Sequence, residues 1–533
     1  MKKRAIALII VFCFMFSGVA FKLLTVANPK GIYASKNSSV RVKEIANLRG
    51  RIYDRNLKKL VNNEDETYLI IKPSPTVVNK LDKISDKEKV LDELKNGEMS
   101  ISKQENCDIK TDSDILNLKV PKRYSDSTLC HIIGYTDENG DGICGIEKSY
   151  NEFLKENEGS VSAVFKTDAL GRVLLGEDTE IRYDNFDESP GVVLTIDRDI
   201  QKITEEALKN GGIKKGAAVV LKADTCEILA CASLPSFDPE HPEKCVESKD
   251  SPFINRAFLP YSVGSVFKVV TAAAAIENGI LQSDFICTGK TEKSGVTFNC
   301  NKKAGHGSLD MEKALSVSCN PYFIELAAKV GAKNMLLYAE KFKFDEGFDL
   351  DGIMCESGNL PKIFELNSEA AVGNFGFGQG ELLATPLHIA LCYASLANGG
   401  IYKEPSLVIG TLNDSGTLEK LPQKGSYRIL EEKTAETINA YLAKTVLEGT
   451  GMGAYSPYFT SCGKTATAET GQKNANGKQI LNSWFAGFFP LENPEYVVCI
   501  LKEDGASGSG DDAPIFKEIS ENIYFLRNGT AQS

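Results

Sequence analysis

The chain has 533 residues, of which 42% are hydrophobic and 25% are charged, and its formal net charge is −11. This length predicts more than one domain, and the balance is that of a globular chain rather than a disordered or fibrous one. The net negative charge argues against nucleic acid as a partner. The four histidines (His131, His241, His306 and His388) show no metal-ligand spacing, so we expect no histidine-rich metal centre and no metal among the site residues.

The N-terminus begins with the basic stretch Met1-Lys2-Lys3-Arg4, and an apolar run follows over residues 5–21. Counted on to Leu24, the run gives about twenty helical residues, close to the ~30 Å span of a bilayer core. Residues 1–24 are therefore predicted to be a cytoplasmic stub and a single-pass membrane anchor, with the rest of the chain outside the cytoplasm. A cleaved signal peptide is the alternative, because Gly18 and Ala20 can precede a cut.

Residues 25–190 are predicted to form an N-terminal, non-catalytic pedestal module. The apolar residues 68–71 indicate a short strand within it. Ser85 followed by Glu88 fits a capping box, which predicts an exposed helix over residues 86–95 that ends near Gly97.

Residues 191–533 are predicted to form the catalytic domain. Its first elements are a strand over residues 191–196 and a helix over residues 198–210. Two apolar strands follow at residues 216–221 and 226–232, and the tight link between them predicts an antiparallel hairpin.

A serine and a lysine three residues apart, Ser265 and Lys268, stand at the head of an alanine-rich helix that Gly279 is placed to end. On a helix these positions share one face, so Lys268 can take the proton of the Ser265 hydroxyl. The helix dipole would favour an oxyanion beside them. The alternative is an ordinary helix start whose lysine faces solvent, because Ser-x-x-Lys is common by chance and counts only with companion motifs.

The chain contains fourteen cysteines, and they do not cluster as in a disulfide scaffold. Cys287 and Cys300 flank a short loop and can pair, which would stabilise the fold by roughly 3 kcal/mol. The remaining cysteines are interpreted as small buried hydrophobic residues.

Two further motifs supply possible companions. Ser318-Cys319-Asn320 stands at the start of a predicted helix that runs to Lys329. Asn320 either caps this helix, donates a hydrogen bond to substrate, or does both. Ser318 is a candidate proton relay. The stretch Cys462-Gly463-Lys464-Thr465-Ala466-Thr467 fails as a phosphate-binding loop because Tyr458 stands where that loop needs glycine. It instead predicts a strand on which Thr465 and Thr467 share one face near the Lys464 cation.

Two strands over residues 483–489 and 496–501 and a last helix over residues 513–526 complete the predicted domain.

The ordered triplet Ser-x-x-Lys, Ser-x-Asn and Lys-Thr-x resembles the penicilloyl serine transferases, and the whole chain resembles class B penicillin-binding proteins. Supporting stretches are Arg49-Gly50-Arg51-Ile52-Tyr53-Asp54, Gly378-Gln379-Gly380 and Trp484-Phe485-Ala486-Gly487. The resemblance implies an α+β fold with an antiparallel sheet packed between helices, preceded by the pedestal module and the single anchor.

The same resemblance implies a peptidoglycan D,D-transpeptidase that is acylated by stem peptides and by β-lactams and uses no cofactor. A glycosyltransferase of the elongation or division machinery is the expected protein partner. The implied roles are those of nucleophile (Ser265), base (Lys268), proton relay (Ser318), cation beside the base and the substrate carboxylate (Lys464), and substrate-binding groups (Asn320, Thr465 and Thr467).

Two positions depart from the family pattern. Ala466 stands where glycine is usual, and Val263 stands where proline is common. Neither change removes a reacting group, so we expect an altered rate or an altered β-lactam affinity rather than inactivity. The alternatives to a transpeptidase are a D,D-carboxypeptidase, a β-lactamase or β-lactam sensor, and a non-enzymatic scaffold of a cell-wall complex.

Overall fold

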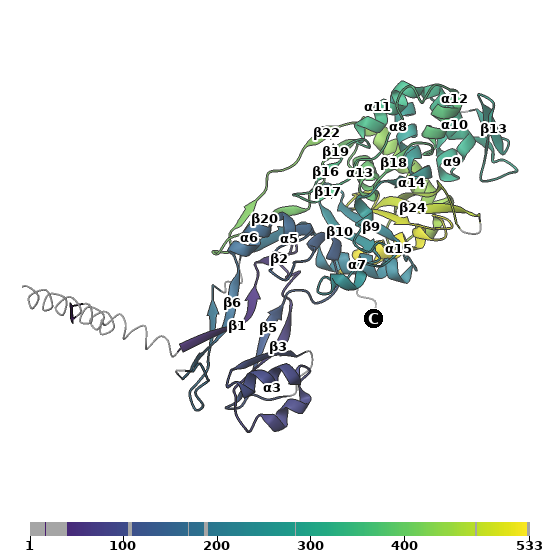
Figure 1. Cartoon of the computed structure of the whole chain (residues 1–533). Helices are drawn as coiled ribbons and strands as arrows, with labels where there is room; N and C mark the ends of the chain where they lie inside the picture. The colour runs from purple at the N-terminus through teal and green to yellow at the C-terminus, as the bar shows by residue number, and fades with distance from the viewer. Residues whose placement is uncertain are drawn as a thin grey trace, which may run out of the picture. The chain divides into compact units, whose positions relative to one another are not determined.

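α-Helices and mostly antiparallel strands are divided between two units of the chain (Figure 1). The computed structural model describes residues 16–17, 40–104, 109–168, 170–185, 190–282, 284–474 and 477–529. Among these residues, no helix combines the length and the apolar character needed to cross a membrane. The predicted anchor lies outside the described residues apart from Phe16 and Ser17.

The smaller unit is made of the described residues within 1–50, 62–125 and 155–188. It holds two antiparallel three-stranded sheets, one with the order β1-β6-β7 and one with the order β4-β3-β5. Its elements are β1 (Val40–Leu48), β3 (Glu64–Ile71), η1 (Val78–Lys83), α3 (Lys87–Lys95), β4 (Ser100–Gln104), β5 (Ile115–Lys122), β6 (Gly159–Lys166) and β7 (Glu180–Asp184).

The helix predicted over residues 86–95 is present as α3, but the capping box is not formed. The N-cap is Asp86, whose side chain makes no capping bond, and the Ser85 hydroxyl instead donates to Gln104 Oε1 of β4 at 3.4 Å. The Ser85 side chain therefore bonds to a residue of β4 rather than to the helix end that local spacing predicted.

The larger unit comprises residues 51–61, 126–154 and 189–533. Two segments from the first 190 residues therefore pack with the part of the chain that carries the candidate motifs. The division at residues 190 and 191 into pedestal and catalytic domains stays a prediction.

A five-stranded antiparallel sheet with the order β10-β9-β25-β24-β23 forms the centre of the larger unit. Its strands are β9 (Gly216–Lys222), β10 (Ile228–Leu234), β23 (Cys462–Lys473), β24 (Gln479–Phe489) and β25 (Tyr496–Lys502). The predicted hairpin is confirmed as β9 and β10, and the two predicted terminal strands are confirmed as β24 and β25.

Helices cover both faces of this sheet (Figure 1). On one face lie α7 (Arg198–Asn210) and α15 (Asp512–Asn528), which confirm two predicted helices. Their apolar side chains form one buried core with alternate residues of the strands, including Ile200, Phe485 and Phe516. The opposite face carries α13 (Pro386–Ala397), and α14 (Glu432–Glu448) packs against β23.

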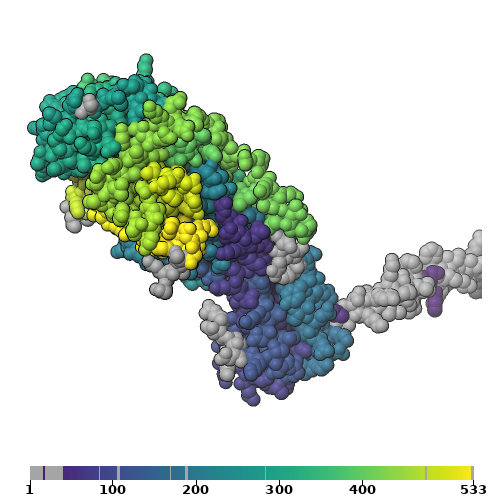
Figure 2. Space-filling view, turned by 180° about the vertical axis from the view of Figure 1, so that it is seen from behind, coloured from purple at the N-terminus to yellow at the C-terminus, as the bar shows by residue number. Residues whose placement is uncertain are grey.

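In Figure 2, the yellow surface of α15 adjoins the yellow-green surface of the residues before β23. At this place α15 contacts the short helix η5 (Met452–Ala454). The C-terminal helix is thereby held against the segment that leads into the strand of Lys464.

A four-stranded sheet with the order β2-β8-β20-β21 includes the parallel pair β2 and β8. Its strands are β2 (Arg51–Tyr53), β8 (Gly191–Leu194), β20 (Val408–Leu412) and β21 (Leu418–Lys420). The remaining pairs are β11 (Tyr261–Ser262) with β18 (Leu383–Ala384), β12 (Phe285–Cys287) with β15 (Gly307–Leu309), β13 (Lys290–Lys293) with β14 (Val296–Asn299), β16 (Phe348–Asp349) with β17 (Met354–Cys355), and β19 (Ile401–Lys403) with β22 (Ser426–Arg428).

The other helices lie between these strands. They are α4 (Cys130–Ile133), α5 (Gly145–Ser149), α6 (Asn151–Glu156), η2 (Pro242–Cys245), η3 (Arg256–Phe258), η4 (Gly264–Phe267), α8 (Lys268–Glu277), α9 (Met311–Ser316), α10 (Asn320–Val330), α11 (Ala332–Lys341) and α12 (Glu369–Gly376).

Candidate active site

Ser265 and Lys268 lie where the 3₁₀ helix η4 passes into α8. Ser265 is partly exposed, whereas Lys268 is fully buried. The backbone before Ser265 needs glycine, because Gly264 has a φ of +68° and its N–H donates to Gly378 O at 2.7 Å. A Cβ on Gly378 would stand 1.9 Å from Gly264 O, so both glycines permit the close approach that fixes the serine.

Lys268 is the centre of a buried polar cluster. Its Nζ donates to Asn320 Oδ1 at 2.6 Å, to Ser318 O at 3.0 Å and to Ser318 Oγ at 3.2 Å. Burial disfavours the charged amine and lowers the pKa of Lys268 to about 7. Close to neutral pH a substantial fraction of this amine is thus unprotonated and able to accept a proton.

Ser318 occupies the short link between α9 and α10, and its φ of +55° is uncommon for a residue other than glycine. Its N–H donates to Leu315 O at 3.2 Å, which closes the turn after α9. This backbone conformation costs of order 1 kcal/mol and places the Ser318 hydroxyl and carbonyl on the Lys268 amine.

Asn320 does not cap α10. The N-cap is Cys319, which makes no side-chain capping bond, and the Asn320 carboxamide oxygen accepts from Lys268 instead. The capping interpretation was wrong because a tertiary partner 52 positions away in sequence competes for the same oxygen. The predicted helix itself is confirmed, with Gly331 at its C-cap.

Lys464 lies on β23 and is fully buried. Desolvation and the nearby positive charge of Lys268 hold the pKa of Lys464 well below its usual range. The charge of Lys268 on α8 thus acts on Lys464 of β23.

The two threonines of the strand differ in their surroundings. Thr465 is buried and its hydroxyl donates to Thr450 Oγ1 at 2.8 Å, whereas Thr467 is exposed. Thr467 O lies beside η4, 3.3 Å from the position a Cβ on Gly264 would take. The strand therefore runs along the element that carries Ser265, with a solvent-accessible hydroxyl next to it.

The methyl group of Ala466 is 3% exposed. A Cβ on Gly264 would stand 3.4 Å from Ala466 Cβ, so the methyl group faces the backbone of η4. Ala466 alternates along β23 with Thr465 and Thr467, which puts its side chain on the other face of the strand. The extra methyl group fills space between β23 and η4 rather than the exposed threonine side.

Sequence patterns did not identify the residues that hold the strand and the serine segment together. Trp484 of β24 pairs with Ala466, and its Nε1–H donates to Ser262 O at 3.0 Å. Glu503 accepts from Arg256 Nε at 2.8 Å and from the Tyr261 hydroxyl at 2.9 Å. Of these residues, only Trp484, the single tryptophan of the sequence, stands in a stretch that resembles the family. Tyr261 and Glu503 are 242 positions apart, so no local pattern indicates their contact.

The sequence-predicted residues thus come from three places: η4 with α8, the α9–α10 link, and β23. Hydrogen bonds join Lys268 to Ser318 and Asn320, and charge couples Lys268 to Lys464. Ser265 lies three positions before Lys268. A serine hydroxyl, an amine with a pKa near neutrality and a second hydroxyl are the groups needed for acyl transfer through a covalent serine ester.

Known proteins are similar to this chain in sequence and in fold. The model of the penicillin binding protein transpeptidase domain matches residues 216–521, more than half of the chain. Stage V sporulation protein D of Bacillus subtilis is 30% identical over 395 residues, which cover 71% of this chain and 59% of that protein. The peptidoglycan D,D-transpeptidase MrdA of Acinetobacter baumannii is 27% identical over an alignment of 573 residues, which covers 92% of this chain and 82% of that protein.

A solved structure with the same fold is that of penicillin binding protein 3 from Mycobacterium tuberculosis, complexed with aztreonam. Its TM-score is 0.66 at 24% identity, with 92% of this chain and 98% of that chain covered. The chain spans less than two thirds of the length of the Bacillus relative. The extent of the family match nevertheless decides the assignment: this chain belongs to the penicillin-binding protein transpeptidase family.

Proposed function

We propose that this chain is a peptidoglycan D,D-transpeptidase, a serine-type enzyme that cross-links D-Ala-D-Ala stem peptides. The observation that carries the proposal is the buried Lys268 amine, which is bonded to Ser318 and Asn320 one helical turn after Ser265. Membership of the transpeptidase family and the activity for which the Acinetobacter relative is named support the same activity.

In the acylation step, Ser265 Oγ attacks the carbonyl carbon of the penultimate D-Ala, and the neutral Lys268 amine accepts the hydroxyl proton. The backbone N–H groups of Ser265 and Thr467 stabilise the oxyanion. The C–N bond to the terminal D-Ala then breaks, and Ser318 relays a proton to the leaving amine. The acyl group remains on Ser265 as an ester until an amine of a neighbouring stem peptide attacks it.

Residues of β23 and Asn320 orient the substrate. The exposed Thr467 hydroxyl donates to the terminal carboxylate next to Thr465, and the buried Lys464 amine lies on the other face of the strand. Because Asn320 Oδ1 accepts from Lys268, the Nδ2 donor on the same amide is the arm that binds the stem-peptide backbone.

The same chemistry makes the chain a target of β-lactams. Attack of Ser265 on the lactam carbonyl opens the ring, but the amine that leaves stays tethered to the acyl group. The deacylating amine is then kept out, so the acyl-enzyme accumulates. The β-lactam complex of the Mycobacterium relative supports this part of the proposal.

Labelling with a fluorescent penicillin tests the acylation step. We expect the wild-type chain to be labelled and the Ser265→Ala variant to remain unlabelled. A matched control is Ser357→Ala, which removes an exposed hydroxyl outside the cluster and should be labelled like wild type. Absence of wild-type label at saturating probe would contradict the enzyme proposal and leave a non-enzymatic scaffold as the function.

A second assay separates the transpeptidase from a D,D-carboxypeptidase, which shares every catalytic group and differs in using water as the acceptor. The wild-type chain is supplied with a stem pentapeptide and an acceptor amine, and the products are separated by mass. We expect cross-linked product with release of D-Ala. Hydrolysed tetrapeptide alone would replace the transpeptidase proposal with the carboxypeptidase.

We further propose that residues 1–24 anchor the chain in the cell membrane and that residues 25–190 form a non-catalytic pedestal module outside the cytoplasm. The basic start and the apolar run of residues 5–21 support this location. A glycosyltransferase that polymerises the glycan strands is the proposed protein partner. An alkaline phosphatase fusion after residue 40 should be active at the cell surface, and an inactive fusion would contradict the orientation.

A further inference from the structure

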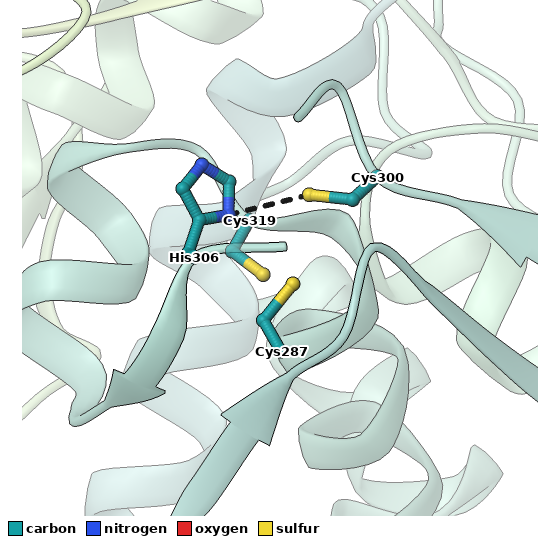
Figure 3. Close-up of side chains that lie close together, drawn as sticks. All are labelled: Cys287, Cys300, His306 and Cys319. Atoms are coloured by element: carbon teal, nitrogen blue, oxygen red, sulfur yellow. Dashed lines mark hydrogen bonds between the residues drawn. The ribbon is translucent and has the colours of Figure 1, made fainter. Parts of the chain in front are cut away.

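Three cysteines and one histidine converge beside the α9–α10 link (Figure 3). They are Cys287, Cys300, His306 and Cys319, and one potential ligand atom of each lies within 4.8 Å of all the others. Cys300 Sγ and His306 Nδ1 are 3.3 Å apart. All three cysteines are buried free thiols, so the possible disulfide between Cys287 and Cys300 is not formed.

These separations suit a tetrahedral metal ion. With Zn–S bonds of about 2.3 Å and Zn–N bonds of about 2.0–2.1 Å, tetrahedral ligand atoms stand roughly 3.5–3.8 Å apart. The four side chains need to move inward by about an ångström at most to reach this geometry. In Figure 3 the four side chains point toward one common space.

The backbone around the cluster is shaped to bring the ligands together. Cys287 of β12 pairs with Gly307, the residue after His306, and the N–H of Cys300 donates to Gly289 O at 2.8 Å. Gly289 and Gly305 both have positive φ angles, and a Cβ on either would stand 2.0–2.2 Å from a carbonyl oxygen of the facing loop. The glycines therefore allow two ligand-bearing loops to touch.

Residues 284–310, which we call the excursion, lack a hydrophobic core of their own. Apart from glycines, the buried residues within it are Cys287, Cys300 and Leu309. A segment of this size with so little apolar burial needs another source of stability, and a structural metal is a common one. The two buried thiols stand where such a metal would bind.

The chemistry of the ligand set favours zinc. Three sulfur ligands and an imidazole form a closed set of four, the composition of structural zinc sites rather than of catalytic ones. A Cys287–Cys300 disulfide, in contrast, would leave Cys319 and His306 facing it without a role.

We propose that Cys287, Cys300, His306 and Cys319 bind one Zn²⁺ ion in a tetrahedral structural site. The ion ties the excursion to the start of α10.

The site also reaches the reacting groups, because Cys319 stands between Ser318 and Asn320. Both neighbours bond to the Lys268 amine, at 3.2 Å and 2.6 Å. A metal bond to Cys319 fixes the backbone of this link, including the left-handed conformation of Ser318. Cys319 is thus a positioning residue. This consequence rests on the proposed acyl-transfer function, whereas metal binding does not.

Metal content of the purified full-length chain tests the site directly. Wild type, reduced and given Zn²⁺ before desalting, should retain about one zinc per chain, and Cys287→Ser and Cys300→Ser should retain less than about a tenth of that. Cys245→Ser, which removes a cysteine outside the cluster, should retain the wild-type content. Wild type without zinc after this treatment, or a Cys287–Cys300 disulfide in peptide mass spectra, would overturn the proposal.

Cobalt substitution covers the case in which the serine variants fail to fold. Replacing the metal of the wild-type chain with Co²⁺ should produce thiolate-to-cobalt charge-transfer absorption together with the strong visible bands of tetrahedral Co²⁺. An octahedral cobalt spectrum without a thiolate band would contradict a sulfur-ligated tetrahedral site even if no variant can be purified.

Acylation of the chelated wild-type chain tests the positioning role. We expect the acylation rate constant at saturating penicillin to fall on the order of 10- to 100-fold and to return with Zn²⁺ but not with Mg²⁺. An unchanged rate constant in zinc-free chain would overturn the positioning role and leave the metal site standing. A zinc-loaded chain that is never acylated would instead contradict the proposed function.

Discussion

The central sheet and the excursion are stabilised in different ways, although both hold groups of the same site. In and against the sheet, the side chains of Trp484, Phe485 and, from α15, Phe516 are fully buried, and the Phe485 and Phe516 rings lie 4.6 Å apart. In the excursion, two thiols and Leu309 are the buried side chains. Burial of apolar surface therefore positions Lys464, whereas the excursion has few buried apolar side chains and meets the link of Ser318 and Asn320 through the cysteine cluster.

A catalytic cluster can therefore be held in place by two independent means, burial of apolar surface and binding of a metal. Hydrophobic burial spreads its stabilisation over many residues and does not depend on a solute. A metal site concentrates stabilisation in four bonds, which vanish when the ion is removed. The proposed zinc makes one half of the site sensitive to metal supply and leaves the other half insensitive.

The largest expected effect comes from truncating the sheet core. Phe485→Ala should lower the free energy of unfolding of the larger unit by about 3–5 kcal/mol, because it deletes a fully buried ring. Phe298→Ala in the excursion is the matched control and should cost roughly 1 kcal/mol, since that ring is only partly buried. Denaturant unfolding measures both, and equal costs would contradict the difference between the two regions.

Removal of the metal should destabilise the excursion and leave the stability of the sheet unchanged. Hydrogen exchange of the zinc-loaded and the chelated chain should show faster exchange in residues 284–310 after chelation, because the ligands no longer hold the strands. Strands β24 and β25 should remain protected. Faster exchange spread evenly over both regions would show that they are stabilised together.

The sequence predicted the parts of the site that depend on local spacing. Ser265 and Lys268 are three positions apart, and the alternation of Thr465 and Thr467 follows from a strand period of two. The central hairpin and the terminal elements also followed from local patterns of apolar residues.

The contacts that local spacing could not predict are tertiary. Asn320 bonds Lys268 rather than its own helix, and the cysteine cluster joins residues whose separations match no short metal motif. Analysis of histidine pairs could not detect the cluster because it has one histidine, and His306 obtains its partners only after β12 and β15 pair. Trp484 reaches Ser262 through the register of β23 and β24, which the sequence does not encode locally.

The pH dependence of acylation tests the role of the buried amine. Burial lowers the pKa of Lys268 from 10.5 to about 7, so the neutral, proton-accepting form dominates above that pH and is lost as the pH falls below it. Between pH 7 and pH 5 the acylation rate should fall about tenfold per pH unit. Stopped-flow acylation with a chromogenic cephalosporin measures the profile, and a rate independent of pH over this range would contradict Lys268 as the base.

The smallest expected effect is that of Ala466→Gly. The methyl group faces Gly264 on the buried side of β23, so its removal should cost roughly 0.5–1 kcal/mol of stability. The acylation rate should change by less than about fivefold, the equivalent of ~1 kcal/mol. A gain well above tenfold in Ala466→Gly would show that the methyl group obstructs the substrate side of the strand.

The central claim is that Ser265 forms the acyl-enzyme, and mass spectrometry of the chain after brief exposure to benzylpenicillin tests it most directly. We expect the intact mass to rise by the mass of one penicillin molecule and the adduct to map to Ser265, with none formed in Ser265→Ala. An unmodified wild-type chain, or an adduct on another residue that persists in Ser265→Ala, would contradict it.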